Sequence, residues 1–254
     1  MTEAVFSLSG RVACVTGASS GIGRAIASAF ARAGAAVVGV ARREDRLKDW
    51  VKDVEGEGAR AAACPLDLSD SEGASASAER LREPFGAPDI LVNAAGVNLR
   101  EPAEEVTLES WRRTLEINLS VPFFLARALV PAMREKGWGR IINIASLQSE
   151  RAMPSSIAYG ASKGGVAQLT RAMAEAWSRY GITCNALAPG FFPTELTAPV
   201  FENDTAVERN AAQTCIGRNG RDEDLVGPAV FIASPASDYV TGQLLYVDGG
   251  FTAK

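Results

Sequence analysis

The sequence predicts one doubly wound α/β domain over residues 1–254, with a seven-stranded, mostly parallel sheet and helices on both of its faces. Short apolar runs alternate with longer amphipathic stretches along the chain. The runs are apolar throughout, and no segment rich in proline and serine divides the sequence. Strands that are apolar on both sides must be covered on both faces, as parallel strands connected by helices are.

Each element is assigned from its length, its periodicity and the residues at its ends. The apolar runs, bounded by Gly, Pro, Asn or Asp, predict strands over residues 12–16, 36–40, 61–66, 90–92, 140–145, 183–188 and 243–247. The amphipathic stretches predict helices over residues 22–33, 46–55, 72–82, 108–134, 158–180 and 222–233. Segment 191–218 has few periodic apolar positions and contains two prolines, so it is predicted to be a lid or substrate loop.

The composition narrows the possible chemistry. The chain has 254 residues, of which 47% are hydrophobic and none is histidine, and its formal net charge is −4. An apolar fraction near one half can form a core and argues against disorder. Without histidine there is no imidazole base, no Ser-His-Asp or Cys-His pair and no histidine-bound zinc. Acid–base chemistry must therefore come from Tyr, Lys, Cys or a carboxylate with a shifted pKa, and no catalytic metal is expected.

The same data bear on partners and location. The weak negative charge, without a basic run, argues against binding to nucleic acid or to an anionic membrane surface. No stretch approaches about 18 uninterrupted apolar residues, and the first residues lack the features of a signal peptide, so we expect neither a membrane span nor secretion. The four cysteines form no C-x-x-C pair, and three lie in predicted strands. This pattern is typical of reduced core residues and predicts a cytoplasmic protein.

The first predicted strand leads directly into a glycine-rich turn that precedes a helix. Gly17, Gly21 and Gly23 follow the spacing G-x3-G-x-G, which differs from G-x-G-x-x-G. Glycines in such a turn let backbone N–H groups approach a phosphate, and the helix N-terminus adds partial positive charge. The turn therefore predicts a nucleotide site; the alternative is a glycine-rich turn without a ligand.

The end of the second predicted strand indicates which nucleotide is bound. Sheets of this type often hold the ribose 2′-hydroxyl with an acidic residue at this point. Here Ala41 is followed by Arg42 and Arg43. Guanidinium groups suit a 2′-phosphate, so we predict NADP(H) in preference to NAD(H). The alternative is that the two arginines simply begin a solvated helix.

A candidate proton donor follows the fifth predicted strand. Ser146 closes this strand, and Tyr159 and Lys163 are four residues apart on one face of the next helix. Lowering a tyrosine pKa from about 10 by about 3 units requires roughly 4 kcal/mol. An ammonium about 5 Å away supplies roughly 3 kcal/mol at an effective dielectric near 20. A cationic nicotinamide could supply the remainder; the alternative is an ordinary pair on a solvated helix face.

These pieces, in this order, resemble the short-chain dehydrogenase/reductase family, whose fold is of the Rossmann type. The resemblance extends from Gly10 to Gly250. It includes Asp67 after the third strand, the stretch 93–96 (Asn-Ala-Ala-Gly) after the fourth, and residues 189–194, which begin Pro-Gly and end in Thr. It implies an NAD(P)-dependent oxidoreductase acting on CH–OH groups.

The resemblance also implies roles for individual residues. Tyr159 would exchange a proton with the substrate, Ser146 would hold the substrate oxygen, and Lys163 would lower the pKa of Tyr159 and bind the nicotinamide ribose. Asn118 would help to position Lys163 through water and a proton relay. The cofactor-binding residues would be Gly17, Ser19, Ser20, Gly21, Ile22, Gly23, Arg42, Arg43, Asp67, Leu68, Asn93, Ala94, Gly96, Tyr159, Lys163, Pro189, Gly190, Phe192 and Thr194.

Three stretches are expected to line the substrate pocket: residues 97–100, 147–151 and 191–215. Residues 146–151 and 189–197 resemble those of sugar-acid and polyol dehydrogenases of the gluconate 5-dehydrogenase type. Such a pocket needs several hydrogen-bonding groups and often an arginine for a carboxylate. The predicted substrate residues are Asn98, Gln148, Glu150, Phe191 and either Arg100 or Arg151.

Two other functions stay open. A 3-oxoacyl carrier-protein reductase, or another keto reductase, would need an apolar channel, for which Phe191, Phe192 and Leu196 are available. It would also need a basic patch, for which Arg112 and Arg113 are available. A non-catalytic nucleotide-binding sensor is the third function, although the intact Tyr–Lys pair argues against it. The resemblance further implies a homotetramer built with residues 108–134, 158–180 and 248–254.

Overall fold

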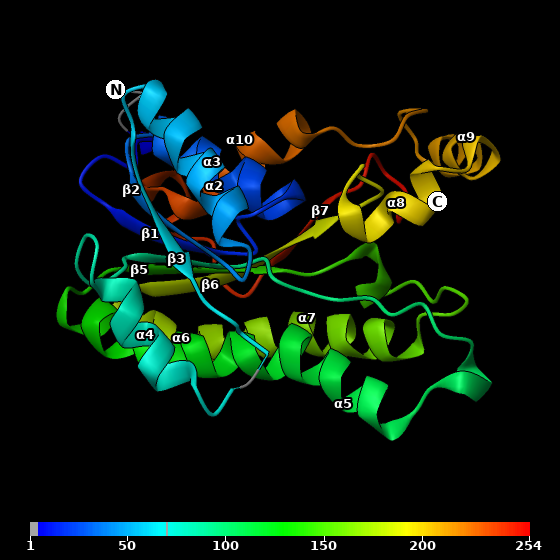
Figure 1. The fold of residues 1–254 in the computed structure, drawn as a ribbon, viewed down its shortest axis with the longest axis horizontal. Helices are drawn as coiled ribbons and strands as arrows, with labels where there is room; N and C mark the ends of the chain where they lie inside the picture. Colours follow the sequence, from blue (N-terminus) through cyan, green and yellow to red (C-terminus); the bar gives the residue numbers. More distant parts are fainter. Residues whose placement is uncertain (1–4, 70) are drawn as a thin grey trace.

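The chain folds around one sheet of seven strands in the order β3-β2-β1-β4-β5-β6-β7 (Figure 1). The computed structural model describes residues 5–69 and 71–254. Every paired strand is parallel to its neighbour, so the predicted doubly wound α/β fold is confirmed. The strands are β1 (Val12–Thr16), β2 (Ala36–Ala41), β3 (Arg60–Pro65), β4 (Ile90–Asn93), β5 (Gly139–Ile144), β6 (Ile182–Pro189) and β7 (Leu244–Val247).

The strand order explains where a ligand can bind. It runs outward from β1 through β2 to β3, and in the opposite direction through β4 to β7. Where the order reverses, the connecting helices pass to opposite faces and leave a crevice outside the carboxyl ends of the strands. Here that crevice lies at the ends of β1 and β4.

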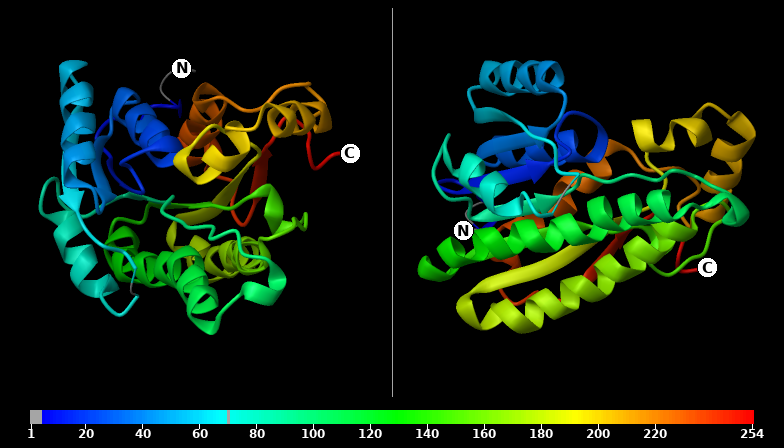
Figure 2. Two further views of the ribbon diagram at one scale, coloured as in Figure 1. Left: turned by 45° about the vertical axis from the view of Figure 1, so that its right-hand side comes forward. Right: turned by 60° about the horizontal axis from the view of Figure 1, so that its bottom comes forward.

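Helices cover both faces of the sheet (Figures 1 and 2). One face carries α2 (Gly21–Arg32), α3 (Glu44–Gly56) and α10 (Asp222–Ala233). The other carries α4 (Ala74–Arg82), α5 (Leu108–Leu115), α6 (Val121–Glu135) and α7 (Ile157–Trp177). Phe30, Trp50 and Ile232 are buried in the first layer, and Leu125 and Leu129 in the second. As expected, Cys14, Cys64 and Cys184 are buried, whereas Cys215 is exposed.

The predicted helix 108–134 is interrupted. A π-helical turn, η2 (Glu116–Ser120), separates α5 from α6. By length and composition alone, the run Leu108–Glu135 could cross a membrane. In the fold, however, its α6 part packs on the sheet, with Leu125 and Met133 fully buried.

The predicted loop 191–218 contains helical structure. It forms the turn η5 (Glu195–Thr197), then α8 (Ala198–Phe201) and α9 (Asp204–Gln213). These pieces are short and their buried positions are few, so the sequence shows no clear period there. Figure 1 shows α8 and α9 beyond the carboxyl end of β7, at the edge of the crevice.

Candidate functional site

A large pocket, with a volume of about 820 Å³, opens at the carboxyl ends of the strands. Its walls come from the turn after β1, the ends of β2 and β3, the loops after β4 and β5, α7 and segment 191–218. This volume is suited to a large organic ligand. The sequence-predicted residues that line it are Gly17, Ser19, Ser20, Gly21, Ile22, Gly23, Arg42, Arg43, Asp67, Leu68, Ala94, Gly96, Asn98, Ser146, Gln148, Tyr159, Lys163, Pro189, Gly190, Phe191, Phe192 and Thr194.

The glycine-rich turn has no room for side chains. Gly17 has φ +71°, and a Cβ there would lie 3.0 Å from the backbone of Ala94 and Ala95. A Cβ on Gly23 would lie 2.7 Å from the carbonyl carbon of Gly17. The first turn of α2 contains no acidic residue, so the partial positive charge at this helix N-terminus is not neutralised locally. This bare backbone beside a helix N-terminus fits a pyrophosphate.

The two arginines after β2 lie in different environments. The Arg43 guanidinium donates hydrogen bonds to the Ser19 hydroxyl (3.0 Å), the Ser20 hydroxyl (2.9 Å) and the Glu195 carboxylate (2.9 Å). Arg42 lines the pocket, and its side chain makes no hydrogen bond with any of the described residues, 5–69 and 71–254. Asp67 also lines the pocket, where its carboxylate accepts from the backbone N–H of Ser69 at 3.0 Å.

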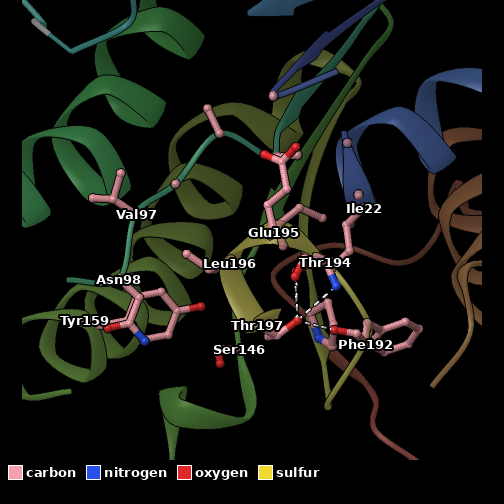
Figure 3. A pocket seen from close by; sticks show the side chains of 18 of the residues that line it. Ile22, Val97, Asn98, Ser146, Tyr159, Phe192, Thr194, Glu195, Leu196 and Thr197 are labelled. Carbon is pink, nitrogen blue, oxygen red and sulfur yellow. Dashed lines mark hydrogen bonds between the residues drawn. The ribbon is translucent and has the colours of Figure 1, made fainter. Parts of the chain in front are cut away.

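Ser146, Tyr159 and Lys163 converge on the same pocket. Figure 3 shows Ser146 and Tyr159 there. Ser146 follows β5, and the other two residues lie on the first turns of α7. The Lys163 ammonium donates to the carbonyl of Ile144 at 2.6 Å and lies 5.6 Å from the centre of the Tyr159 ring. Burial without a carboxylate partner lowers the pKa of Lys163 to about 8.

The electrostatics of Tyr159 differ from the prediction. Burial of the phenol raises its pKa, while a hydrogen bond with Ser146 and the positive charge of Arg100 act in the opposite direction. The net shift is upward, opposite to the predicted lowering, because the cost of burying a phenolate outweighs the opposing contributions of Ser146 and Arg100.

Asn118 lies outside the pocket lining, behind the loop after β4. Its side chain accepts from the N–H of Val97 (2.8 Å) and donates to the Val97 carbonyl (2.9 Å) and to the Ser162 hydroxyl (3.0 Å). Its amide therefore joins the loop after β4 to α7, beside Lys163. The π-helical turn that carries Asn118 is a distortion often found at functional sites.

Three other predicted residues also lie off the pocket lining. Asn93 donates to the Asn143 side chain at 2.9 Å and so links β4 to β5 inside the sheet. The Arg151 guanidinium donates to the backbone carbonyl of Lys254 at 3.0 Å, and Glu150 interacts with the Tyr246 hydroxyl. The prediction that Glu150 and Arg151 face the pocket is corrected here, because the loop after β5 turns them toward the C-terminal segment.

The pocket lining distinguishes between the two predicted arginines and adds residues that were not singled out from the sequence. Of the two arginines considered for a carboxylate, it is Arg100 that lines the pocket, and α9 contributes Arg209 and Asn210. Glu195 adds a carboxylate. Arg209 and Asn210 lie within the predicted substrate stretch, but no periodic pattern distinguished them from their neighbours.

A doubly wound parallel sheet, a glycine turn at a helix N-terminus and a Ser–Tyr–Lys set in one pocket define a dinucleotide-dependent oxidoreductase. A family model described as enoyl-(acyl carrier protein) reductase matches residues 17–252. The chain belongs to the short-chain dehydrogenase/reductase family of NAD(P)-dependent oxidoreductases acting on CH–OH groups. It is therefore an enzyme, and a non-catalytic sensor is not supported.

Full-length relatives have names in sugar-acid metabolism. The chain is 41% identical over 250 residues to gluconate 5-dehydrogenase of Gluconobacter oxydans, covering 98% of each chain. It is 42% identical over 249 residues to 2-dehydro-3-deoxy-D-gluconate 5-dehydrogenase of Bacillus subtilis, covering 98% and 97%. A crystal structure of gluconate 5-dehydrogenase from Burkholderia cenocepacia, in complex with NADP and tartrate, superposes with a TM-score of 0.95 at 38% identity, covering 100% of both chains.

Proposed function

We propose that this enzyme interconverts a secondary alcohol and a ketone of a sugar acid, with NADP(H) in preference to NAD(H). The observation that carries the proposal is the convergence of Ser146, Tyr159 and Lys163 with Arg100 around one pocket. The Ser–Tyr–Lys set is suited to a CH–OH centre. The guanidinium of Arg100 is suited to a carboxylate on the same substrate molecule. The names of the relatives, and the tartrate in the Burkholderia structure, support the sugar-acid class.

The side chains divide the proton chemistry between them. In alcohol oxidation, the Ser146 hydroxyl holds the substrate oxygen and the Tyr159 phenolate accepts the hydroxyl proton. The positive charges of Lys163 and Arg100 favour the phenolate form. The nicotinamide cofactor that this pocket would hold would supply the hydride chemistry, as acceptor in oxidation and as donor in reduction. In reduction, Tyr159 returns its proton to the oxygen. Asn118 acts as a positioning residue because it fixes the loop after β4 against α7 beside Lys163.

The cofactor would extend along the glycine turn. Gly17, Gly21 and Gly23 leave space for the pyrophosphate, and Arg43 with Ser19 and Ser20 forms a cluster of donors suited to a 2′-phosphate. Asp67 and Leu68 would face the adenine, and Ala94 and Gly96, with the buried Asn93 behind them, would border a ribose. Lys163 would hold the nicotinamide ribose, and Pro189, Gly190, Phe192 and Thr194 would border the nicotinamide.

The cofactor preference is tested with Arg42→Ala and Arg43→Ala. Each should raise the KM for NADP(H) about tenfold or more and change that for NAD(H) less than twofold, since a charge-assisted contact contributes about 1.5–3 kcal/mol. Equal effects of both variants on the two cofactors would contradict the assignment.

The substrate end is polar and carries a strained arginine. The backbone of Arg100 has φ +55°, in the left-handed region that favours glycine. This conformation is costly for most other residues and is often found at functional sites. Its N–H donates to the Asn98 side chain at 3.2 Å, and its guanidinium donates to the Leu196 carbonyl at 3.1 Å. The buried Gln148 Oε1 has no hydrogen-bond partner among the described residues, so a substrate hydroxyl could satisfy it.

A keto reductase for acyl chains fits this pocket less well. The Phe191 ring packs against Phe251 at 5.7 Å, and Phe192 is 2% exposed and fills the space beside Gly220. Both rings are thus used mainly in packing. Gluconate, sugar alcohols and acetoacetyl thioesters, assayed with NADP(H) and NAD(H), should give turnover on the sugar acid; turnover on the thioester alone would favour the acyl reductase.

The proposal involves no metal ion. Among the described residues that line the pocket, the acidic ones are Asp67 and Glu195. Each of these carboxylates already accepts a hydrogen bond. Added chelator is expected to leave turnover unchanged. A chelator-sensitive enzyme would require a metal site outside this donor set.

We also propose a homotetramer, as the family resemblance implies, and a cytoplasmic location, as the composition and the cysteine pattern indicate. Leu108 at the start of α5 and Ile157 at the start of α7 are 64% and 50% exposed, which suits helix faces that contact other subunits. Light scattering on the purified protein tests the assembly.

A further inference from the structure

The Arg43 guanidinium holds a carboxylate from a distant part of the chain. Its two terminal nitrogens each donate to one carboxylate oxygen of Glu195, both at 2.9 Å. The same guanidinium donates to Ser19 and Ser20 in the glycine turn. Glu195 belongs to the segment that borders the substrate end of the pocket, so this ion pair spans the cleft.

The neighbours of Glu195 contact both ends of the pocket. A Cβ added to Gly21 would lie 3.1 Å from the Thr194 side chain, which shows how closely this segment covers the glycine turn. On the other side, the Leu196 carbonyl accepts from Arg100 at 3.1 Å. Residues 194–196 therefore join the proposed cofactor end to the proposed substrate end (Figure 3).

A phosphate could take the place of the Glu195 carboxylate on Arg43. A carboxylate engages two guanidinium nitrogens in the same forked geometry that a phosphate uses. The side chains of Arg43 and Glu195 are 43% and 61% exposed, so solvent weakens their attraction. A doubly charged phosphate would therefore displace the carboxylate, while a ribose hydroxyl would not.

We propose that Glu195 is a cofactor-specificity residue that competes with the 2′-phosphate for Arg43. NADP(H) must separate Glu195 from Arg43, which releases the Glu195 side chain beside the substrate pocket. NAD(H), which lacks the phosphate, leaves the pair closed. This inference rests on the proposed NADP(H) site at Arg43. It adds that Glu195, in the segment beside the substrate pocket, lowers the affinity for NADP(H) but not for NAD(H).

The test measures dissociation constants for NADP⁺ and NAD⁺ by calorimetry. Glu195→Gln keeps the shape of the side chain and removes its charge. It should tighten NADP⁺ binding about fivefold, the upper range for an exposed ion pair, and change NAD⁺ binding less than twofold. Glu202→Gln is the matched control, because Glu202 is exposed in the same segment and makes no ion pair with a described residue.

A double variant shows whether the effect passes through Arg43. In an Arg43→Ala background, Glu195→Gln should change NADP⁺ affinity less than twofold. An equal gain in both backgrounds would overturn the competition, as would an unchanged NADP⁺ affinity in Glu195→Gln. If Arg43→Ala itself leaves NADP⁺ and NAD⁺ affinities unaltered, the cofactor site in the proposed function fails instead. The two failures are thus distinguishable.

Discussion

The ammonium of Lys163 lies 5.6 Å from the centre of the Tyr159 ring, and the lysine is buried in the wall of the pocket. Its one side-chain hydrogen bond to a described residue goes to the Ile144 carbonyl, at 2.6 Å. No carboxylate pairs with it among the described residues, so its charge is desolvated without full compensation. A cation in this position is useful for stabilising a phenolate, but it destabilises the folded protein.

Lys163→Met should therefore stabilise the protein while it abolishes turnover. Burial lowers the pKa of Lys163 from 10.5 to about 8, so folding is penalised below pH 8, and the penalty disappears as the pH rises from 8 to 10.5. A shift of this size corresponds to about 3 kcal/mol, and losing the bond to Ile144 costs about 1 kcal/mol. We expect a net gain of about 2 kcal/mol in the free energy of unfolding at pH 7.

Urea unfolding at pH 7 and at pH 10.5 measures this effect. The gain should be absent at the higher pH, because Lys163 is then neutral in the folded state and only about half protonated in the unfolded state, which leaves a charge penalty of less than about 0.5 kcal/mol. Lys52→Met is the control, since Lys52 is exposed on α3 and its replacement should change stability by less than about 0.5 kcal/mol. An equal gain at both pH values would show that the charge is not its cause.

Tyr159→Phe should separate binding from catalysis. The variant removes the proton-exchanging oxygen and little else, so turnover should fall about a thousandfold. The dissociation constant for NADP⁺ should change less than twofold. Tyr239→Phe is the control, because Tyr239 is fully exposed and should retain full activity. Substantial turnover by Tyr159→Phe would remove this residue from the mechanism.

Arg100→Gln should shift the pH dependence of the reaction. The positive charge of Arg100 lowers the pKa of Tyr159, so its removal raises that pKa. Alcohol oxidation needs the phenolate, so the pH at which its kcat/KM rises should move upward. Ketone reduction needs the phenol and should remain active to a correspondingly higher pH.

Arg113→Gln provides the comparison for this profile. Arg113 also lines the pocket but does not contribute to the pKa shift of Tyr159. Its variant should keep the wild-type pH profile. Profiles that move equally in both variants would assign the shift to a general change in charge, and an unmoved profile in Arg100→Gln would contradict the role of Arg100.

The sequence predicted what depends on local pattern. Each strand is one short apolar run, and the glycine turn is one short stretch of sequence. The sheet and the phosphate-binding turn could therefore be predicted from neighbouring residues. The break at Asn118 could not be predicted, because it coincides with hydrogen bonds to Val97 and Ser162, while the apolar period continues through it. The pairing of Arg43 with Glu195 joins residues 152 positions apart, and the raised pKa of Tyr159 depends on burial. Neither leaves a local signal in the sequence.

The glycine turn provides a test in which one methyl group has opposite effects at two positions. A Cβ on Gly23 would lie 2.7 Å from the carbonyl carbon of Gly17, where backbone atoms of Thr16 and Gly17 occupy the space. Gly23→Ala should therefore push the turn away from α2, weaken NADP⁺ binding at least tenfold and destabilise the fold by about 1–3 kcal/mol. Gly227→Ala places the same methyl group in α10, where nothing lies within 4 Å. Since alanine favours helix over glycine by up to about 1 kcal/mol, that variant should be more stable and bind NADP⁺ normally. Thermal unfolding and calorimetry on the two variants measure both effects, and normal NADP⁺ binding by Gly23→Ala would mean that the close backbone contact is not required to shape the phosphate site.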